Sequence, residues 1–209
     1  MKILIADDHA IVREGVKQIV KTLPEVTLID EASEGNEALL KIKEVGYDLV
    51  ILDISMPGMS GLDILQRITC RKINTRVLML SLHPQEQYAI RAFKLGASGY
   101  LSKDSAFEEL TTAIHKIAAG GKYVSPAFAE KLIFADPEQG PQDLHDSLSE
   151  REFQVMIMLA KGKTVVEIAK EIFISDKTVS TYRSRIMEKM GMKKNTDLTL
   201  YASRNNLIE

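Results

Sequence analysis

The first 120 residues alternate short runs of Ile, Val and Leu with segments of helical periodicity. The apolar runs are Lys2–Ala6, Val26–Ala32, Asp48–Leu52, Arg76–Ser81 and Gly99–Leu101, and the helical segments are Ala10–Leu23, Gly35–Val45, Gly61–Arg71, Gln85–Leu95 and Ala106–Ala119. Strands joined through helices lie parallel, with the helices covering both faces of the sheet. Since such crossovers are right-handed, the pattern predicts an α/β domain with a doubly wound, five-stranded parallel sheet.

The alternation stops after Gly120-Gly121. Pro126 can open a short helix over Ala127–Phe134, and the stretch DPEQGPQDLHDS at 136–147 has the composition of a linker. From Leu148 onward the periodicity is helical throughout. We therefore expect one domain at 1–121, a linker with a possible short helix at 122–147, and a second, all-α domain at 148–209.

Helix signals divide the second domain into four helices. The strings SERE at 149–152 and TVVE at 164–167 are capping boxes, and Ser175 can cap a third helix that ends at Gly191. A fourth helix begins at Asn195 or Thr196 and ends near Arg204. The second and third helices are joined by a short turn at Phe173-Ile174.

Charge is unevenly divided between the two halves. Residues 1–147 carry 16 Lys/Arg and 21 Asp/Glu, whereas residues 148–209 carry 11 and 8, which places a basic segment beside the third helix. No apolar run reaches the roughly 18 residues that a membrane span needs, and the single Cys70 forms no internal disulfide. We expect a cytoplasmic protein.

Polar residues stand at the ends of the predicted strands. Asp7 and Asp8 follow the first strand, Asp53 the third, Ser81 the fourth and Lys103 the fifth. Adjacent central strands end side by side in a doubly wound sheet, so these groups can converge. Gathered carboxylates repel one another, and a hard divalent cation such as Mg2+ relieves that repulsion. Such a carboxylate can also attack a phosphoryl group.

Four strings in the first domain are similar to those of response-regulator receiver domains, which have a flavodoxin-like fold. They are ADDH at 6–9, LDISMPGMSG at 52–61, LMLS at 78–81 and GASGYLSKD at 96–104. The resemblance implies that a sensor histidine kinase phosphorylates Asp53. It also implies that Asp8 and Asp53 bind Mg2+ directly, that Asp7 holds it through water, and that the carbonyl of Ser55 completes the metal site.

The same resemblance implies a switch. Lys103 and Ser81 would grip the phosphoryl group, and Tyr100 would rotate inward when Ser81 moves. His9, next to the acidic residues, is interpreted as a packed loop residue rather than an acid or base.

Residues 148–198 resemble the LuxR-type DNA-binding domain of the NarL/FixJ response regulators, with TVSTYRSRI at 178–186 as an especially close match. The resemblance implies a helix-turn-helix that binds double-stranded DNA, with its second helix, about Ser175–Met190, in the major groove. Ser180, Thr181 and Ser184 would face base edges, and Lys177, Arg183 and Arg185 would meet phosphates or bases. Relatives usually bind DNA as dimers, so a homodimer is expected on phosphorylation. The apolar residues Leu198, Tyr201 and Ala202 of the last helix are either its interface or core.

Two alternatives remain open at this stage. Phosphohydrolases also combine Asp, Ser and Lys in a doubly wound fold, but they usually carry a second Asp two residues after the nucleophile, where this chain has Ser55. We therefore expect no enzyme, but a phosphoacceptor that catalyses the Mg2+-dependent transfer of a phosphoryl group to itself and then slowly dephosphorylates itself. The other alternative, an interaction module with a vestigial pocket, is disfavoured by the complete set of pocket residues.

Overall fold

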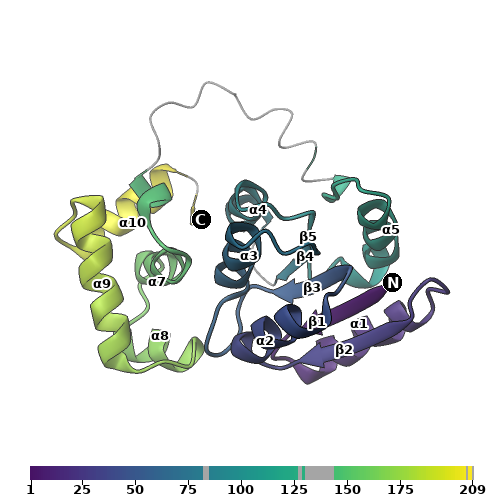
Figure 1. Cartoon of the computed structure of the whole chain (residues 1–209). Coiled ribbons are helices and arrows are strands. Elements are labelled where there is room, and N and C mark those ends of the chain that lie inside the picture. Colours follow the sequence, from purple (N-terminus) through teal and green to yellow (C-terminus); the bar gives the residue numbers. More distant parts are fainter. Residues whose placement is uncertain (82–84, 127–128, 130–143, 206, 209) are drawn as a thin grey trace. The chain divides into compact units, whose positions relative to one another are not determined.

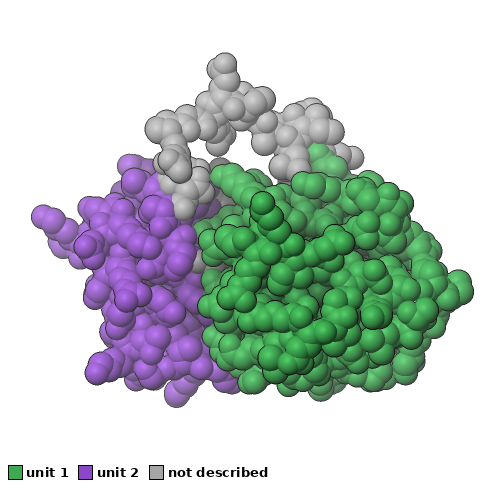
Figure 2. All heavy atoms as spheres, in the orientation of Figure 1, with its two compact units in different colours: residues 1–136 green, residues 137–209 purple. Residues whose placement is uncertain are grey.

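The computed structural model describes residues 1–81, 85–126, 129, 144–205 and 207–208. The chain divides into two compact units, residues 1–136 and 137–209 (Figure 2). Among the described residues, no helix combines the length and the apolar character that crossing a membrane requires.

The first unit contains a parallel five-stranded sheet with strand order β2-β1-β3-β4-β5 (Figure 1). The strands are β1 Lys2–Ala6, β2 Leu28–Ala32, β3 Leu49–Asp53, β4 Arg76–Ser81 and β5 Gly99–Ser102. This order places the ends of β1 and β3 next to each other at the centre of the sheet, with β4 beside β3. The predicted doubly wound parallel sheet is confirmed.

The helices of this unit lie between the strands in sequence. They are α1 Ala10–Lys21, α2 Gly35–Val45, α3 Gly61–Cys70, α4 Gln85–Lys94 and α5 Ala106–Ala118. Successive strand side chains point to opposite faces. One set of strand side chains, which includes Ile5, Ile51 and Leu80, forms a core with α1 and α5. The alternate residues Leu4, Leu52 and Met79 are equally buried, so both faces of the sheet are covered.

Strand ends differ from the expectation by one or two residues. The third strand was expected to stop at Leu52, but β3 continues through Asp53, which pairs in register with Leu80. The second strand starts at Leu28 rather than Val26. As the edge strand of the sheet, β2 has a neighbour on one side only, and four of its five residues are at least partly exposed.

The second unit is helical. Its elements are the short 3-10 turn η1 Leu144–Ser147 and the helices α7 Glu150–Ala160, α8 Val165–Glu171, α9 Asp176–Met190 and α10 Asn195–Arg204. Both predicted capping boxes are present, with Ser149 and Glu152 opening α7 and Thr164 and Glu167 opening α8. The core of this unit includes Phe153, Ile168, Val179, Ile186 and Leu198.

Residues at both ends of the predicted linker make side-chain contacts with the neighbouring unit of the fold to which each end belongs. Tyr123 is buried and its hydroxyl donates a 2.7 Å hydrogen bond to Glu109 of α5. At the other end, the His145 ring in η1 lies 2.8 Å from the Tyr201 hydroxyl of α10. The predicted helix Ala127–Phe134 falls, apart from Ala129, outside the described residues.

Candidate functional site

The carboxyl ends of β1 and β3 bring together an acidic cluster. Ligand atoms of Asp7, Asp8, His9 and Asp53 all lie within 4.8 Å of one another. Asp7 and Asp53 are almost fully buried, whereas Asp8 keeps partial access to solvent. The convergence follows from topology, because Asp7 directly follows β1 and Asp53 ends the neighbouring β3.

Lys103 supplies a buried cation to this cluster. Its Nζ lies 2.7 Å from Oδ2 of Asp7 and 3.0 Å from Oδ2 of Asp53, and its side chain is 3% exposed. The backbone N–H of Lys103 donates to the carbonyl of Ser81 across 2.8 Å, so the ends of β4 and β5 are joined beside the cluster. The structure thus brings Lys103 and the buried Ser81 to the same edge of the sheet.

Burial dominates the electrostatics of Asp53. Desolvation, reinforced by the charge of Asp7, raises the pKa of Asp53 to about 7, although Lys103 favours the ionised form. The buried oxygens Oδ2 of Asp7, Oδ1 of Asp8 and Oδ2 of Asp53 each lie within 3.0 Å of a side-chain nitrogen, which belongs to Lys103 for the two Oδ2 atoms and to His9 for Oδ1 of Asp8. Three clustered carboxylate oxygens fit a hard divalent cation such as Mg2+.

The loop between β3 and α3 is shaped by close backbone contacts. A Cβ at Gly61 would lie 2.0 Å from the carbonyl oxygen of Asp53, and the Gly61 N–H donates to the carbonyl of Ile54 across 2.9 Å. Ser55 and the buried Met56 belong to this loop. The Ser60 hydroxyl then caps α3 by accepting from the Asp63 N–H.

Tyr100 is buried in the middle of β5, with 1% of its surface exposed, and is paired with Met79 of β4. His9 differs from the expectation of a packed loop residue. Its side chain is about half exposed, and its Nδ1 lies 2.7 Å from Oδ1 of Asp8. The sequence offered one signal for this contact: His9 directly follows two acidic residues. The chain turns into α1 at His9, which brings its ring back toward them.

The predicted DNA-reading helix is α9. Its buried side consists of Val179, Ile186 and Met190. Five of the six predicted DNA contacts lie on its exposed side: Lys177, Ser180, Thr181, Ser184 and Arg185.

Arg183 is only partly exposed, and its Nε donates a 2.9 Å hydrogen bond to Oδ1 of Asn195 in α10. Sequence reasoning missed Asn195, since its distance from Arg183 depends on how α9 and α10 cross.

Comparison with known proteins accounts for both units. The family model for the response regulator receiver domain matches residues 3–115, and that for bacterial regulatory proteins of the luxR family matches residues 146–202. The chain is a response regulator of the NarL/FixJ family. It is therefore a regulator of transcription controlled by phosphorylation.

Relatives that match this response regulator over nearly their whole length support the assignment. It is 32% identical to the response regulator GacA of Pseudomonas protegens, over 100% of this chain and 98% of that protein. It is 33% identical to the oxygen regulatory protein NreC of Staphylococcus carnosus, with both chains fully covered. Among solved structures, a complex of the response regulator RcsB with DNA matches with a TM-score of 0.61 and 25% identity, covering 97% of this chain and 98% of that one.

Proposed function

We propose that Asp53 accepts a phosphoryl group from a phosphohistidine of a sensor histidine kinase. The observation that carries this proposal is the position of Asp53: buried at the end of a central strand, beside two further carboxylates, with Lys103 Nζ 3.0 Å away. A carboxylate oxygen of Asp53 attacks phosphorus, the P–N bond breaks, and the electron pair leaves with the imidazole of the kinase. The product is an acyl phosphate on Asp53.

The surrounding residues neutralise the charge that this transfer brings into the cluster. Lys103 pairs with the incoming phosphoryl oxygens, and the Ser81 hydroxyl donates to one of them. Asp8, Asp53, Asp7 and the carbonyl of Ser55 would hold Mg2+, which when bound offsets negative charge on the phosphoryl oxygens. The convergence of carboxylate oxygens from Asp7, Asp8 and Asp53 within 4.8 Å of one another supports this assignment.

The phosphorylated state then shifts the population of receiver conformations. Ser81 moves toward the phosphoryl group, the inward position in which Tyr100 is already buried here is stabilised, and the surface formed by α4, β5 and α5 changes. That change promotes homodimerisation, releases the DNA-binding helices, or does both. The chain acts on itself rather than as an enzyme with turnover, and it loses the phosphoryl group slowly. We propose domain limits of 1–121 for the receiver, 122–147 for the linker and 148–209 for the DNA-binding domain.

DNA binding is assigned to the exposed side of α9. Ser180, Thr181 and Ser184 would face base edges in the major groove, while Lys177, Arg183 and Arg185 would contact phosphates or bases. The exposure of five of these six side chains, beside a buried Val179, Ile186 and Met190, supports this assignment. Because the chain is proposed to act on DNA and to receive its phosphoryl group from a kinase, we place it in the cytoplasm.

The acceptor is tested with a small phosphodonor. Wild type incubated with acetyl phosphate and Mg2+ should gain the mass of one phosphoryl group, while Asp53→Asn should gain none. Peptide mapping after trapping of the acyl phosphate with borohydride should identify Asp53. Labelling that persists in Asp53→Asn would refute the assigned acceptor, and rapid release of phosphate from a small phosphomonoester would favour a phosphohydrolase instead.

A further inference from the structure

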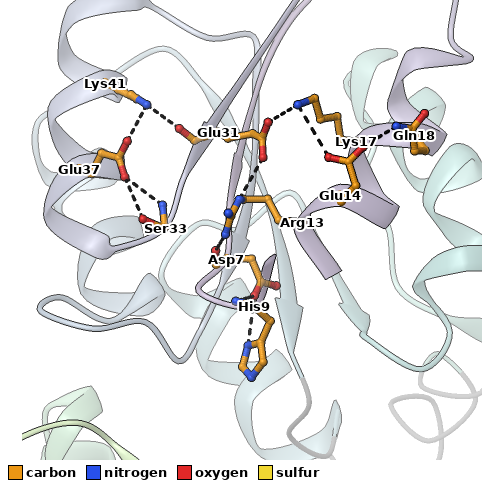
Figure 3. Close-up of polar contacts among 10 residues, drawn as sticks. All are labelled: Asp7, His9, Arg13, Glu14, Lys17, Gln18, Glu31, Ser33, Glu37 and Lys41. Atoms are coloured by element: carbon orange, nitrogen blue, oxygen red, sulfur yellow. Dashed lines mark hydrogen bonds and ion pairs between the residues drawn. The ribbon is translucent and has the colours of Figure 1, made fainter. Parts of the chain in front are cut away.

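Arg13, on α1, connects the acidic cluster to the edge strand of the sheet. Its Nη1 donates a 2.8 Å hydrogen bond to the backbone carbonyl of Asp7, and its Nε donates a 3.0 Å bond to Oε2 of Glu31 on β2 (Figure 3). The Arg13 side chain is 18% exposed. A planar guanidinium can serve both acceptors at once because its donors diverge in a fixed geometry.

The remaining polar groups of Asp7 are also engaged. Its backbone N–H donates to the carbonyl of Ala32 across 3.1 Å, and its Oδ1 accepts the N–H of His9 across 2.8 Å. The bond from Arg13 is therefore a further hydrogen bond that holds Asp7, the residue that directly follows β1 and begins the turn to α1. Asp8, the next residue, is in the same turn.

Glu31 is itself held from two helices. Its carboxylate pairs with Lys17, one turn after Arg13 on α1, and its backbone carbonyl accepts a 2.6 Å bond from Lys41 on α2. Lys41 also pairs with Glu37 across 2.7 Å. Glu31, which orients the Arg13 guanidinium, is thus held by one lysine from α1 and one from α2 (Figure 3).

We propose that Arg13 is a positioning residue of the acidic site, which fixes the turn at Asp7 so that the carboxylates of Asp7 and Asp8 converge on a divalent cation. This inference rests on the proposed metal-dependent function. Two effects of Arg13 oppose each other: its positive charge repels a cation, and its hydrogen bond orders the ligands. Positioning prevails, because Glu31 already offsets the charge, whereas loss of outer partners of a metal site typically costs about tenfold or more in affinity.

Mg2+ affinity of the full chain, measured by isothermal titration calorimetry, tests the proposal. Arg13→Ala should weaken binding about tenfold. Arg13→Lys keeps the charge but not the two diverging donors, so it should weaken binding as well. Lys21→Ala is the matched control: it removes an exposed positive charge from the last turn of the same helix, α1, and should leave Mg2+ affinity unchanged.

A second comparison separates positioning from general stability. Glu31→Ala should weaken Mg2+ binding in the wild-type background but have no further effect when added to Arg13→Ala, because Glu31 acts through Arg13. Equal or tighter binding by Arg13→Ala, or wild-type binding by Arg13→Lys, overturns the positioning role. A wild-type chain that binds no Mg2+ overturns the proposed metal-dependent function itself, so the two failures are distinguishable.

Discussion

The Nε of Arg183, on helix α9, donates a hydrogen bond to Oδ1 of Asn195 in α10 across 2.9 Å. This contact holds one edge of the guanidinium and leaves its two terminal nitrogens to other acceptors. A side chain fixed before binding loses less conformational entropy when it meets a phosphate. Asn195 is therefore expected to assist DNA binding without having to touch DNA.

Arg183→Ala is expected to weaken DNA binding and to reduce the slope of log affinity against log salt by about one. Asn195→Ala should weaken binding less, and should add nothing in the Arg183→Ala background. Fluorescence anisotropy with a labelled operator duplex at several salt concentrations measures both effects. The control is Lys43→Ala, which removes an exposed charge from α2 of the receiver. Additive losses in the double variant would show that Asn195 acts independently of Arg183.

A second contact, between α9 and α7, should make the stability of the helical unit depend on pH. Glu152 is buried, and its carboxylate accepts from Lys189 across 2.6 Å and from the Ser149 N–H across 2.7 Å. Burial alone would raise the pKa of Glu152, but these hydrogen bonds outweigh it and hold the pKa below its usual value. The ionised carboxylate is thus the form that the folded state prefers.

Glu152→Gln should lower the stability of the helical unit by about 1–2 kcal/mol at neutral pH. Because the folded pKa is depressed, this stabilisation is present above the unfolded pKa of about 4.5 and is lost as the pH falls through the folded pKa. The difference from wild type should therefore shrink below about pH 4. Hydrogen exchange of the α7 and α9 amides in the full chain measures this difference in stability. A difference that is independent of pH would contradict the assigned ion pair.

Much of the acidic site was predictable because topology alone creates it. Parallel central strands end at one edge of the sheet, so acids placed after β1 and at the end of β3 had to meet, and Lys103 after β5 could reach them. The two capping boxes were likewise readable, since each depends on residues three positions apart.

The supporting contacts were not predictable from the sequence. Arg13 and Glu31 meet only because α1 crosses beside β2 at one register, and both belong to charged segments that read as ordinary solvated faces. The same holds for Arg183 and Asn195, whose contact depends on the crossing of α9 and α10. Such pairs require tertiary geometry, which periodicity does not specify.

Two glycines of the receiver should respond differently to alanine. At Gly61 a Cβ would lie 2.0 Å from the carbonyl oxygen of Asp53, so Gly61→Ala must displace the loop that carries Ser55. We expect slower acetyl-phosphate labelling together with a loss of stability of about 1–3 kcal/mol. Gly46 ends α2 at φ +67°, where an added Cβ would meet no described atom within 4 Å. Gly46→Ala should cost about 1 kcal/mol through backbone strain alone and leave labelling unchanged.

Labelling rates measured by mass spectrometry, with thermal unfolding in parallel, separate these two cases. Normal labelling in Gly61→Ala would show that the loop tolerates displacement without effect on Asp53.

The acidic cluster should also govern how stability responds to metal. Without divalent ions, Asp53→Asn removes one of the gathered carboxylates and relieves repulsion from Asp7, so the variant should unfold at a higher temperature than wild type in EDTA. At a Mg2+ concentration about ten times its dissociation constant, wild type should gain about 1.4 kcal/mol, whereas Asp53→Asn should gain much less. Asp104→Asn, at an exposed position next to Lys103, should behave as wild type in both conditions. Differential scanning calorimetry measures all three, and an equal gain from Mg2+ in wild type and Asp53→Asn would remove Asp53 from the metal site.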